Sequence, residues 1–335
     1  MCAPIVPDDL VAALRAGSPR LALRISVTDR CQLRCAYCLP PQGVKLLAPE
    51  SILSFEQILR FVRALQSGFG LRQVRLTGGE PLVRRGIVDL VRMLADTGVP
   101  DLSLTTNGQL LPQMAADLRL AGLHRINVSL DSLDPAAYRH ITRGGDLGRT
   151  LDGIREALRV GLRPVKLNMV VMRGLNDHEV ADVARFGLRL GCEVRYLELM
   201  PIGCARAMFD RHFVPAADIK ASMETAFDLV PLVHDVRRTA RDFLASDAAG
   251  LRGRIGFISA VSEPFCSGCD RLRLTSRGEL ISCVGSSCAL NVSHLLAADS
   301  PEALDDLRQL VGRELRRKTT RAAFASERPM ATVGG

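Results

Sequence analysis

Six of the ten cysteines in this 335-residue chain fall into two groups near its opposite ends. Each group holds three cysteines, in the spacings C-x3-C-x2-C (Cys31, Cys35, Cys38) and C-x2-C-x13-C (Cys266, Cys269, Cys283). Three thiolates at such spacings can bind three irons of a 4Fe-4S cubane and leave the fourth iron open to a ligand. In a reducing compartment, clustered cysteines indicate metal binding or catalysis more than disulfides.

Zinc is the alternative for both groups. A structural zinc site normally has four protein ligands. Residues 39–60 contain no cysteine or histidine, which disfavours zinc at the first group. At the second group Cys288 completes C-x2-C-x13-C-x4-C, so spacing alone leaves zinc and an iron–sulfur cluster equally open.

Short β-rich runs alternate with amphipathic helical stretches between residues 21 and 200, which predicts a parallel sheet with right-handed crossovers. In such sheets, loops at the strand ends can converge on one site. The pattern changes after Met200 and indicates a smaller α+β module. We expect an N-terminal extension (1–20), a barrel-like domain (21–210) and a C-terminal module (211–335). The predicted strands are Leu23–Thr28, Gln73–Thr77, Asp101–Thr105, Arg125–Leu130, Val165–Val171 and Glu193–Leu199, and the predicted helices are Ser54–Gln66, Ile87–Asp96, Pro112–Leu120, Gly148–Val160 and Asp177–Leu190.

The net charge of +8 suits an anionic partner, but the basic residues are spread along the chain. The absence of tryptophan and an aromatic content of 4% disfavour a stacking platform for single-stranded nucleic acid. No apolar run reaches the ~18 residues of a membrane span, and the N-terminus lacks a signal-type apolar block. We therefore expect a cytoplasmic protein without a membrane partner, whereas composition leaves both nucleic acid and phosphorylated metabolites open as partners.

The first cysteine group, with Tyr37 before its third cysteine, resembles the signature of the radical S-adenosylmethionine (SAM) superfamily. The turn Thr77-Gly-Gly-Glu-Pro81 resembles the motif that receives the SAM amino group in that superfamily, where Glu80 offers a carboxylate. The resemblance implies a partial (βα)6 TIM-like barrel, and a 4Fe-4S cluster whose open iron chelates SAM.

An ordered series of motifs is similar to the GTP cyclase family that begins molybdenum cofactor biosynthesis. It comprises Arg24-Ile-Ser-Val-Thr-Asp-Arg-Cys31, Arg75-Leu-Thr-Gly-Gly-Glu-Pro-Leu, Leu104-Thr-Thr-Asn-Gly, Asn127-Val-Ser-Leu-Asp131, Val165-Lys-Leu-Asn168, Arg195-Tyr-Leu-Glu-Leu-Met200 and Phe265-Cys-Ser-Gly-Cys269-Asp-Arg-Leu-Arg273. The resemblance implies conversion of GTP to (8S)-3′,8-cyclo-7,8-dihydroguanosine 5′-triphosphate. It also implies that a 5′-deoxyadenosyl radical abstracts the ribose C3′ hydrogen.

The same resemblance implies residue roles. Two 4Fe-4S clusters would be held by the two cysteine groups, and the open iron of the second would bind the guanine end of GTP. SAM would be bound at Tyr37, Gly79, Glu80, Ser129 and Met200. GTP would be bound at Arg24, Arg75, Thr105, Lys166, Arg195, Arg271 and Arg273. Guanidinium and ammonium groups are what a triphosphate requires, and Arg271 and Arg273 would point to one side of a strand.

Family members end in Gly-Gly, as here at Gly334 and Gly335, and the tail is expected to enter the active site and assist catalysis. The implied partners are GTP, an external flavodoxin- or ferredoxin-like electron donor and a downstream cyclic pyranopterin monophosphate synthase, and the resemblance implies no nucleic-acid partner. A homodimer is left open. Cys2, Cys192, Cys204 and Cys288 have no counterpart, and we expect buried free thiols there.

Three alternatives remain at this point. A two-cluster radical SAM enzyme that modifies a peptide would share the N-terminal motifs, but usually carries more C-terminal cysteines and lacks the basic R-x-R. A zinc-ribbon protein would use the positive charge to bind nucleic acid. A degenerate paralogue would keep the clusters without the cyclase activity.

Overall fold

The computed structural model describes residues 21–235, 237–298, 300–316, 318 and 324–334. The predicted N-terminal extension, Cys2 and Gly335 lie outside the described residues. Six neighbouring strands form the centre of one sheet, and every adjacent pair among them is parallel. They are β1 (Leu21–Ser26), β2 (Leu71–Thr77), β3 (Leu102–Thr106), β4 (Arg125–Ser129), β5 (Val165–Val171) and β6 (Glu193–Glu198).

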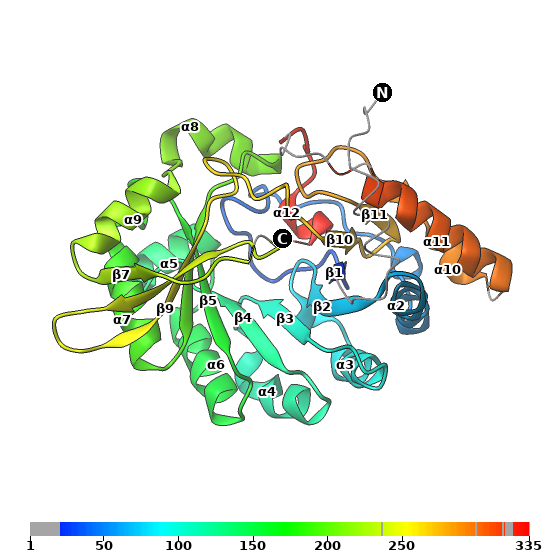
Figure 1. Cartoon of the computed structure of the whole chain (residues 1–335), viewed down its shortest axis with the longest axis horizontal. Coiled ribbons are helices and arrows are strands. Elements are labelled where there is room, and N and C mark those ends of the chain that lie inside the picture. Colours follow the sequence, from blue (N-terminus) through cyan, green and yellow to red (C-terminus); the bar gives the residue numbers. More distant parts are fainter. Residues whose placement is uncertain (1–20, 236, 299, 317, 319–323, 335) are drawn as a thin grey trace.

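Amphipathic helices follow these strands and cover the outside of the curved sheet, while the C-terminal end lies on its inner side (Figure 1). Capping residues mark where these helices begin. Ser54 and Gln57 form a capping box at the helix that starts at Phe55, and Asp134 caps the helix that starts at Pro135. The helices are α2 (Phe55–Phe69), α3 (Ile87–Ala95), α4 (Leu111–Leu120), α5 (Pro135–Thr142), α6 (Leu147–Arg159) and α7 (Val180–Arg189). This is the partial (βα)6 barrel that the resemblance implied.

The C-terminal strands extend the same sheet at both edges, which gives twelve strands in the order β12-β11-β10-β1-β2-β3-β4-β5-β6-β9-β8-β7. The added strands are β7 (Asp228–Pro231), β8 (Arg241–Ser246), β9 (Arg252–Ile258), β10 (Arg271–Leu274), β11 (Glu279–Ile281) and β12 (Leu290–Asn291). Since β9 pairs with β6 and β10 pairs with β1, the C-terminal third continues the barrel sheet. The division near residue 210 stays a prediction.

Further helices complete the chain: α8 (Phe209–His212), α9 (Ala216–Glu224), α10 (Ser293–Ala297), α11 (Pro301–Arg316) and α12 (Met330–Val333). Both α10 and α11 pack beside α2. Short 3-10 helices are η1 (Pro49–Ser51), η2 (Pro81–Val83), η3 (Asp177–Glu179) and η4 (Gly203–Met208).

A bidentate ion pair holds β10 at the barrel edge. Arg72 donates from Nε to Asp270 Oδ2 at 2.6 Å and from Nη2 to Oδ1 at 3.0 Å. Asp270 is buried, so this pair is shielded from solvent and geometrically fixed. The pair thus ties β2 to the residue that directly precedes β10. In this way it joins a strand of the barrel to the segment that carries Cys269.

All six predicted strands and the five predicted barrel helices are present, with ends shifted by a few residues. Helix α5 in the barrel was not predicted, and neither were strands β8, β10, β11 and β12 or helices α8, α10 and α12. None of the helices that the structure describes is long and apolar enough to cross a membrane.

Candidate active site

The first cysteine group occupies the loop after β1, at the carboxyl end of the barrel strands. Cys38 N donates to the Cys35 carbonyl at 2.9 Å, which folds the loop into a turn. Leu33 N donates to Cys31 Sγ at 3.4 Å and Asn107 Nδ2 does so at 3.9 Å. Such N–H donors stabilise cluster-bound thiolates. Burial raises the pKa of Cys31 to about 11 and that of Cys38 to about 12, so a bound metal is needed to hold them as thiolates.

The glycines after β2 let two loops approach each other. Gly79 N donates to the Thr28 carbonyl at 2.8 Å, and Glu80 N donates to the Arg30 carbonyl at 2.8 Å. A Cβ on Gly79 would lie 2.4 Å from the Arg30 oxygen, and a Cβ on Gly78 would lie 2.6 Å from the Thr28 oxygen. The glycines are therefore required by the backbone that leads into the first cysteine group.

Glu80 is buried, and its carboxylate fixes the neighbouring loop after β3. Oε1 accepts from Thr106 Oγ1 at 2.7 Å and from Leu82 N at 3.1 Å, while Oε2 accepts from Asn107 N at 2.7 Å. Burial raises its pKa to about 7. The structure thus gives Glu80 a loop-positioning role, and its contact with the SAM amino group stays a prediction.

The other predicted SAM residues lie at or near the carboxyl ends of strands. Tyr37 donates its hydroxyl to Asp131 Oδ2 at 2.8 Å, and Asp131 Oδ1 accepts from Val170 N at 3.0 Å. Ser129 is the last residue of β4, and Met200 comes two residues after β6.

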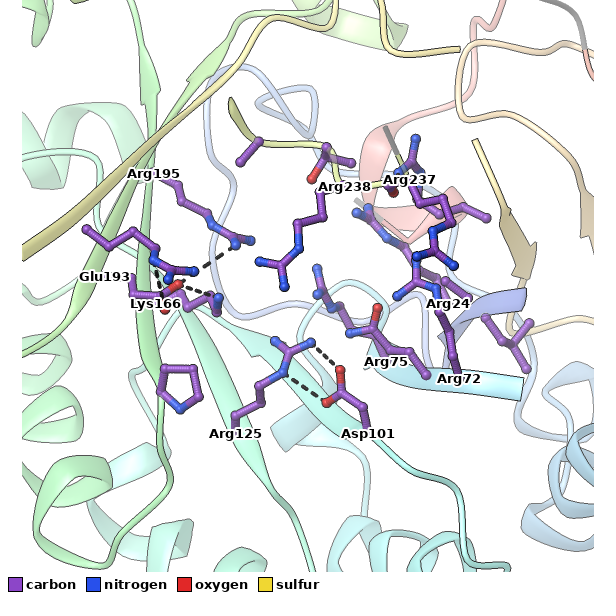
Figure 2. A pocket seen from close by; sticks show the side chains of 18 residues that line it. Arg24, Arg72, Arg75, Asp101, Arg125, Lys166, Glu193, Arg195, Arg237 and Arg238 are labelled. Carbon is purple, nitrogen blue, oxygen red and sulfur yellow. Dashed lines mark hydrogen bonds and ion pairs between the residues drawn. The ribbon is translucent and has the colours of Figure 1, made fainter. Parts of the chain in front are cut away.

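A cavity of about 340 Å³ opens at the amino ends of the same strands and is lined by cationic side chains (Figure 2). Five predicted GTP residues line it: Arg24, Arg75, Lys166, Arg195 and Arg271. Thr105 does not line it; its hydroxyl accepts from Asn127 Nδ2 at 3.2 Å. Unpredicted basic residues that also line it are Arg72, Arg125, Arg237, Arg238 and Arg254.

Strand register explains why cations from distant sequence positions meet. Arg24 on β1 is the Cα partner of both Arg75 on β2 and Arg273 on β10. Side chains in register on neighbouring strands point to the same face. These three arginines therefore form a row across three strands on the inner side of the barrel.

Several cavity cations lack an acidic partner. Arg125 pairs with Asp101 at 2.6 Å, and Lys166 pairs with Glu193. Among the described residues, no carboxylate lies within ion-pair distance of Arg24, Arg75 or Arg271. Burial, and then the neighbouring guanidinium groups, hold the pKa values of Arg24 and Arg75 well below their usual range. Buried like charges that depress one another's pKa indicate a site for a polyanion.

A second cavity of about 160 Å³ is lined by all three cysteines of the second group, with Met200, Arg271 and Arg273. Arg24 and Arg271 line both cavities, so the two are neighbours. The R-x-R pair shares this cavity, as predicted. Burial raises the pKa of Cys269, but the Lys318 ammonium and the Arg271 guanidinium outweigh it and bring that pKa to about 7.

Cys288 is exposed and is not among the residues lining this cavity, which weighs against the four-cysteine zinc ribbon. The expectation of a buried thiol there was wrong, because the segment between Cys283 and β12 turns along the surface. Cys192 is buried in the core, as expected. Cys204 is half-buried, with its thiol 3.6 Å from the Ala36 carbonyl.

Within the part of the chain that the structure describes, no three His, Cys, Asp or Glu side chains converge on a point where a single metal ion would have three ligands. The thiols of the first group share one loop and those of the second line one cavity, and in a multi-iron cluster each thiolate binds a different iron. Both cysteine groups fit such a cluster.

The two cysteine groups lie at opposite ends of neighbouring parallel strands. The first follows β1, whereas Cys269 precedes β10, which runs parallel to β1. β1 has six residues and spans roughly 17 Å at ~3.3 Å per residue. We expected one site at the strand rim, but the predicted residues extend through the barrel from one end to the other.

The C-terminal tail lies between the two cysteine groups. The Arg273 guanidinium donates to the Gly334 carbonyl, and the Ala331 backbone is near enough to the Cys38 thiol to lower its pKa against the effect of burial. The tail therefore reaches the first group at Ala331 and the second at Gly334, while the position predicted for Gly335 is outside the described residues.

Sequence reasoning did not find several polar residues that build this site. Asp131 and Glu198 are buried carboxylates that accept backbone N–H groups. Both lie inside motifs that carry the family resemblance, but no role was assigned to either of them. In the sequence, Arg125 and Arg238 could not be distinguished from the many arginines that lie on the surface. One feature of the sequence could have drawn attention to Lys318, which is that lysine is rare: the chain has four lysines among 44 lysine and arginine residues.

Solved structures share this fold. The chain aligns with Streptococcus suis SuiB bound to precursor peptide SuiA with a TM-score of 0.64 and 16% identity, over 91% of this chain and 69% of that one. SuiB bound to S-adenosylmethionine aligns with a TM-score of 0.60 and 16% identity, over 90% and 71%. At this identity the likeness concerns the fold alone.

Sequence comparisons identify the family. The Radical SAM superfamily model matches residues 25–187, and the Molybdenum Cofactor Synthesis C model matches residues 192–324. The GTP 3′,8-cyclase of Geobacter sulfurreducens is 45% identical over 318 residues, covering 93% of this chain and 96% of that protein. That of Desulforamulus reducens is 41% identical over 320 residues, covering 93% and 97%. The chain therefore belongs to the GTP 3′,8-cyclase family of radical SAM enzymes.

Proposed function

We propose that this chain converts GTP to (8S)-3′,8-cyclo-7,8-dihydroguanosine 5′-triphosphate in molybdenum cofactor biosynthesis. The observation that carries the proposal is the row of Arg24, Arg75 and Arg273, which continues from a cationic cavity into the cavity of the second cysteine group. A nucleoside triphosphate matches this arrangement, because it has a polyanion at one end for the cationic cavity and a base with N and O donor atoms at the other end for the second cysteine group.

The first cluster would be held by Cys31, Cys35 and Cys38, with SAM near Tyr37, Gly79, Glu80, Ser129 and Met200. When bound, the cluster and SAM supply the 5′-deoxyadenosyl radical that removes the C3′ hydrogen of the ribose. The protein's contribution is positional: the Gly78–Gly79 turn packs on the backbone of Thr28–Arg30 and so fixes the entry to the cysteine loop.

A second 4Fe-4S cluster would be held by Cys266, Cys269 and Cys283, with the guanine end of GTP at its open iron. Three thiols around one small cavity, beside Arg271 and Arg273, support this assignment. The opposite strand ends of the two cysteine groups support it as well, because GTP bound across the two neighbouring cavities at the amino ends would have the first cysteine group and SAM at the other end of the barrel, toward which its ribose would point.

Arg24, Arg75, Lys166 and Arg195 would bind the triphosphate. Their mutual repulsion in the free protein is relieved when an anion enters, which favours binding of the most highly charged nucleotide. Thr105 lies beyond the cavity wall and would act through Asn127, whose backbone pairs with Lys166 on the next strand.

The tail would shield the reacting centre. Gly334 contacts Arg273 on one side, and a Cβ there would lie 2.9 Å from Thr77 Cγ2 on the other. Such closure excludes water from a radical intermediate. An external flavodoxin- or ferredoxin-like protein would supply the electron, and a cyclic pyranopterin monophosphate synthase would consume the product.

The test is anaerobic incubation of the reconstituted protein with a chemical reductant, SAM and GTP. We expect a cyclised nucleotide that requires all three, with 5′-deoxyadenosine formed alongside. Arg75→Ala should raise the KM for GTP more than tenfold, since it removes a buried guanidinium. Deoxyadenosine formation without any GTP-derived product would contradict the proposal and favour a paralogue without cyclase activity.

A further inference from the structure

Lys318 places a buried ammonium group against the second cysteine group. Its side chain is 7% exposed. Its Nζ lies 3.5 Å from Cys269 Sγ and donates to the Ser282 carbonyl at 2.9 Å and to the Arg271 carbonyl. An ammonium has three donors, and all three are directed at these acceptors.

The acceptors belong to two separate segments that carry the cysteines. Cys269 and Arg271 flank the start of β10, whereas Ser282 directly precedes Cys283 after β11. Lys318 thus links the two backbone segments whose cysteines line the cavity of the second group. Among the described residues no carboxylate forms an ion pair with Lys318, so the Cys269 thiolate is its anionic partner there.

The rarity of lysine in this chain makes the buried position of Lys318 more informative. Only Lys45, Lys166, Lys220 and Lys318 are lysines, against 44 basic residues in total. Of these four, Lys166 and Lys318 are buried, and both are at the active site. Arginine is the ordinary cation of this chain, so a buried lysine here is unusual, and its ammonium provides a charge with donors in three directions.

We propose that Lys318 is a positioning residue of the second cluster, which joins its two ligand-bearing segments and neutralises part of its thiolate charge. This inference rests on the second cluster of the proposed function. Three thiolates bring negative charge beside a substrate that is itself a polyanion, and Lys318, which does not line the cavity, offsets that charge without occupying the space for the substrate.

A nearby cation and an N–H donor to a cluster sulfur both stabilise the more negative, reduced cluster and so raise its reduction potential. Lys318→Met removes both at similar side-chain length. Lys318→Arg keeps the charge but changes its shape. Lys220→Met is the matched control, since Lys220 lies on α9 and pairs with Glu224.

The experiment uses full-length protein with Cys31→Ala, Cys35→Ala and Cys38→Ala, so that only the second cluster remains. Its midpoint potential is measured by anaerobic redox titration followed by electron paramagnetic resonance, together with iron content. We expect Lys318→Met to lower the reduction equilibrium constant at least tenfold, which is ~59 mV for one electron. Lys318→Arg should shift it less, and Lys220→Met should not shift it.

Each outcome decides between the possibilities. A Lys318→Met protein that keeps its cluster at an unchanged potential would overturn the inference. Loss of iron from Lys318→Met but not from Lys318→Arg would support it, because the charge is then what the site requires. Loss from both would overturn it, since shape alone would be responsible. If the parent triple variant bound no cluster, the proposed second cluster itself would fail.

Discussion

The Arg273 guanidinium donates a hydrogen bond to the backbone carbonyl of Gly334. This contact joins the R-x-R strand of the second cysteine group to the C-terminal tail. The same tail packs against Thr77, ahead of the glycine turn, and its Ala331 backbone is near enough to the Cys38 thiol to influence its pKa. The tail is therefore the segment through which the two ends of the barrel contact each other.

Gly334→Ala should displace this tail. Gly334 has a φ of 73°, which disfavours any side chain, and a Cβ would lie 2.9 Å from Thr77 Cγ2. We expect the rate of cyclised product to fall roughly tenfold, a cost of ~1.4 kcal/mol, while 5′-deoxyadenosine continues to form. The measurement is the ratio of the two products.

Gly98→Ala is the matched control for that substitution. Gly98 has a φ of 70°, and a Cβ added there would have nothing within 4 Å, so this variant carries the backbone strain without the contact. An unchanged product ratio in Gly334→Ala would show that the tail position does not matter for the chemistry.

The barrel could be predicted from the sequence because each of its strands and helices has a local signal. Val165–Val171 is rich in apolar and β-branched residues, and Ser54 with Gln57 marks a helix start. The C-terminal strands had weaker signals. β10 has four residues and pairs with β1, about 250 positions earlier in the chain. No local pattern encodes such a pairing, so the second cysteine group was assigned to a separate module.

The site residues also divide into those that a contiguous motif marks and those that only the folded strands bring together. The cysteines and Gly78–Gly79 could be found from spacing, because the motif is contiguous. The row of Arg24, Arg75 and Arg273 depends on register across three strands and was reached only through the family resemblance. Sequence reasoning missed Lys318, whose contacts depend entirely on where the chain passes after α11.

Lys166 should make GTP binding pH-dependent. Burial, and then Arg195, lower the pKa of its ammonium to about 8 in spite of Glu193. A bound triphosphate favours the protonated form, so the pKa is higher in the complex. The dissociation constant for GTP should therefore rise as pH increases above 8, by at most tenfold per pH unit for one proton.

Lys166→Arg should flatten this profile, because a guanidinium stays protonated throughout. Equilibrium binding of GTP between pH 7 and 9.5 checks it. Lys220→Arg, on the surface helix α9, should retain the wild-type profile. A wild-type pH dependence in Lys166→Arg would mean that another group titrates.

Glu198 should hold the second cysteine segment on the barrel. Its Oε1 accepts from Ala216 N at 2.7 Å and from Ser262 Oγ, while its Oε2 accepts from Val261 N at 2.7 Å and Ser262 N at 2.9 Å. Glu198→Gln places an NH₂ against N–H donors, and each unsatisfied buried group costs ~1–3 kcal/mol.

We therefore expect Glu198→Gln to lower the urea concentration at which cluster absorbance is lost, by an amount equivalent to about 2 kcal/mol. Iron bound by the second cysteine group should fall first. Glu50→Gln, on an exposed 3-10 helix, is the control. An unaltered urea midpoint in Glu198→Gln would show that the amide satisfies the same donors.

Arg238 should act as a mobile clamp on the triphosphate. It lies on the loop between β7 and β8 and points into the cationic cavity between Arg195 and Arg75 (Figure 2). Its guanidinium is 3.6 Å from Asp242 Oδ2, and the other oxygen of that buried carboxylate has no hydrogen-bond partner among the described residues. The arginine is therefore held loosely by one weak ion pair.

Because its side chain is 55% exposed, Arg238 should contribute about 1 kcal/mol to GTP binding, less than the buried arginines. Arg238→Gln should raise the KM for GTP about fivefold, with kcat unchanged, and should weaken the salt dependence of binding. Arg241→Gln is the matched control, since Arg241 is equally exposed at 55% but pairs with Glu263 on the surface. If the KM of Arg238→Gln equals that of Arg241→Gln at low salt, Arg238 is not part of the GTP-binding site. A fall in kcat would instead indicate that the loop between β7 and β8 orders the second cavity, which the loop lines with Thr239.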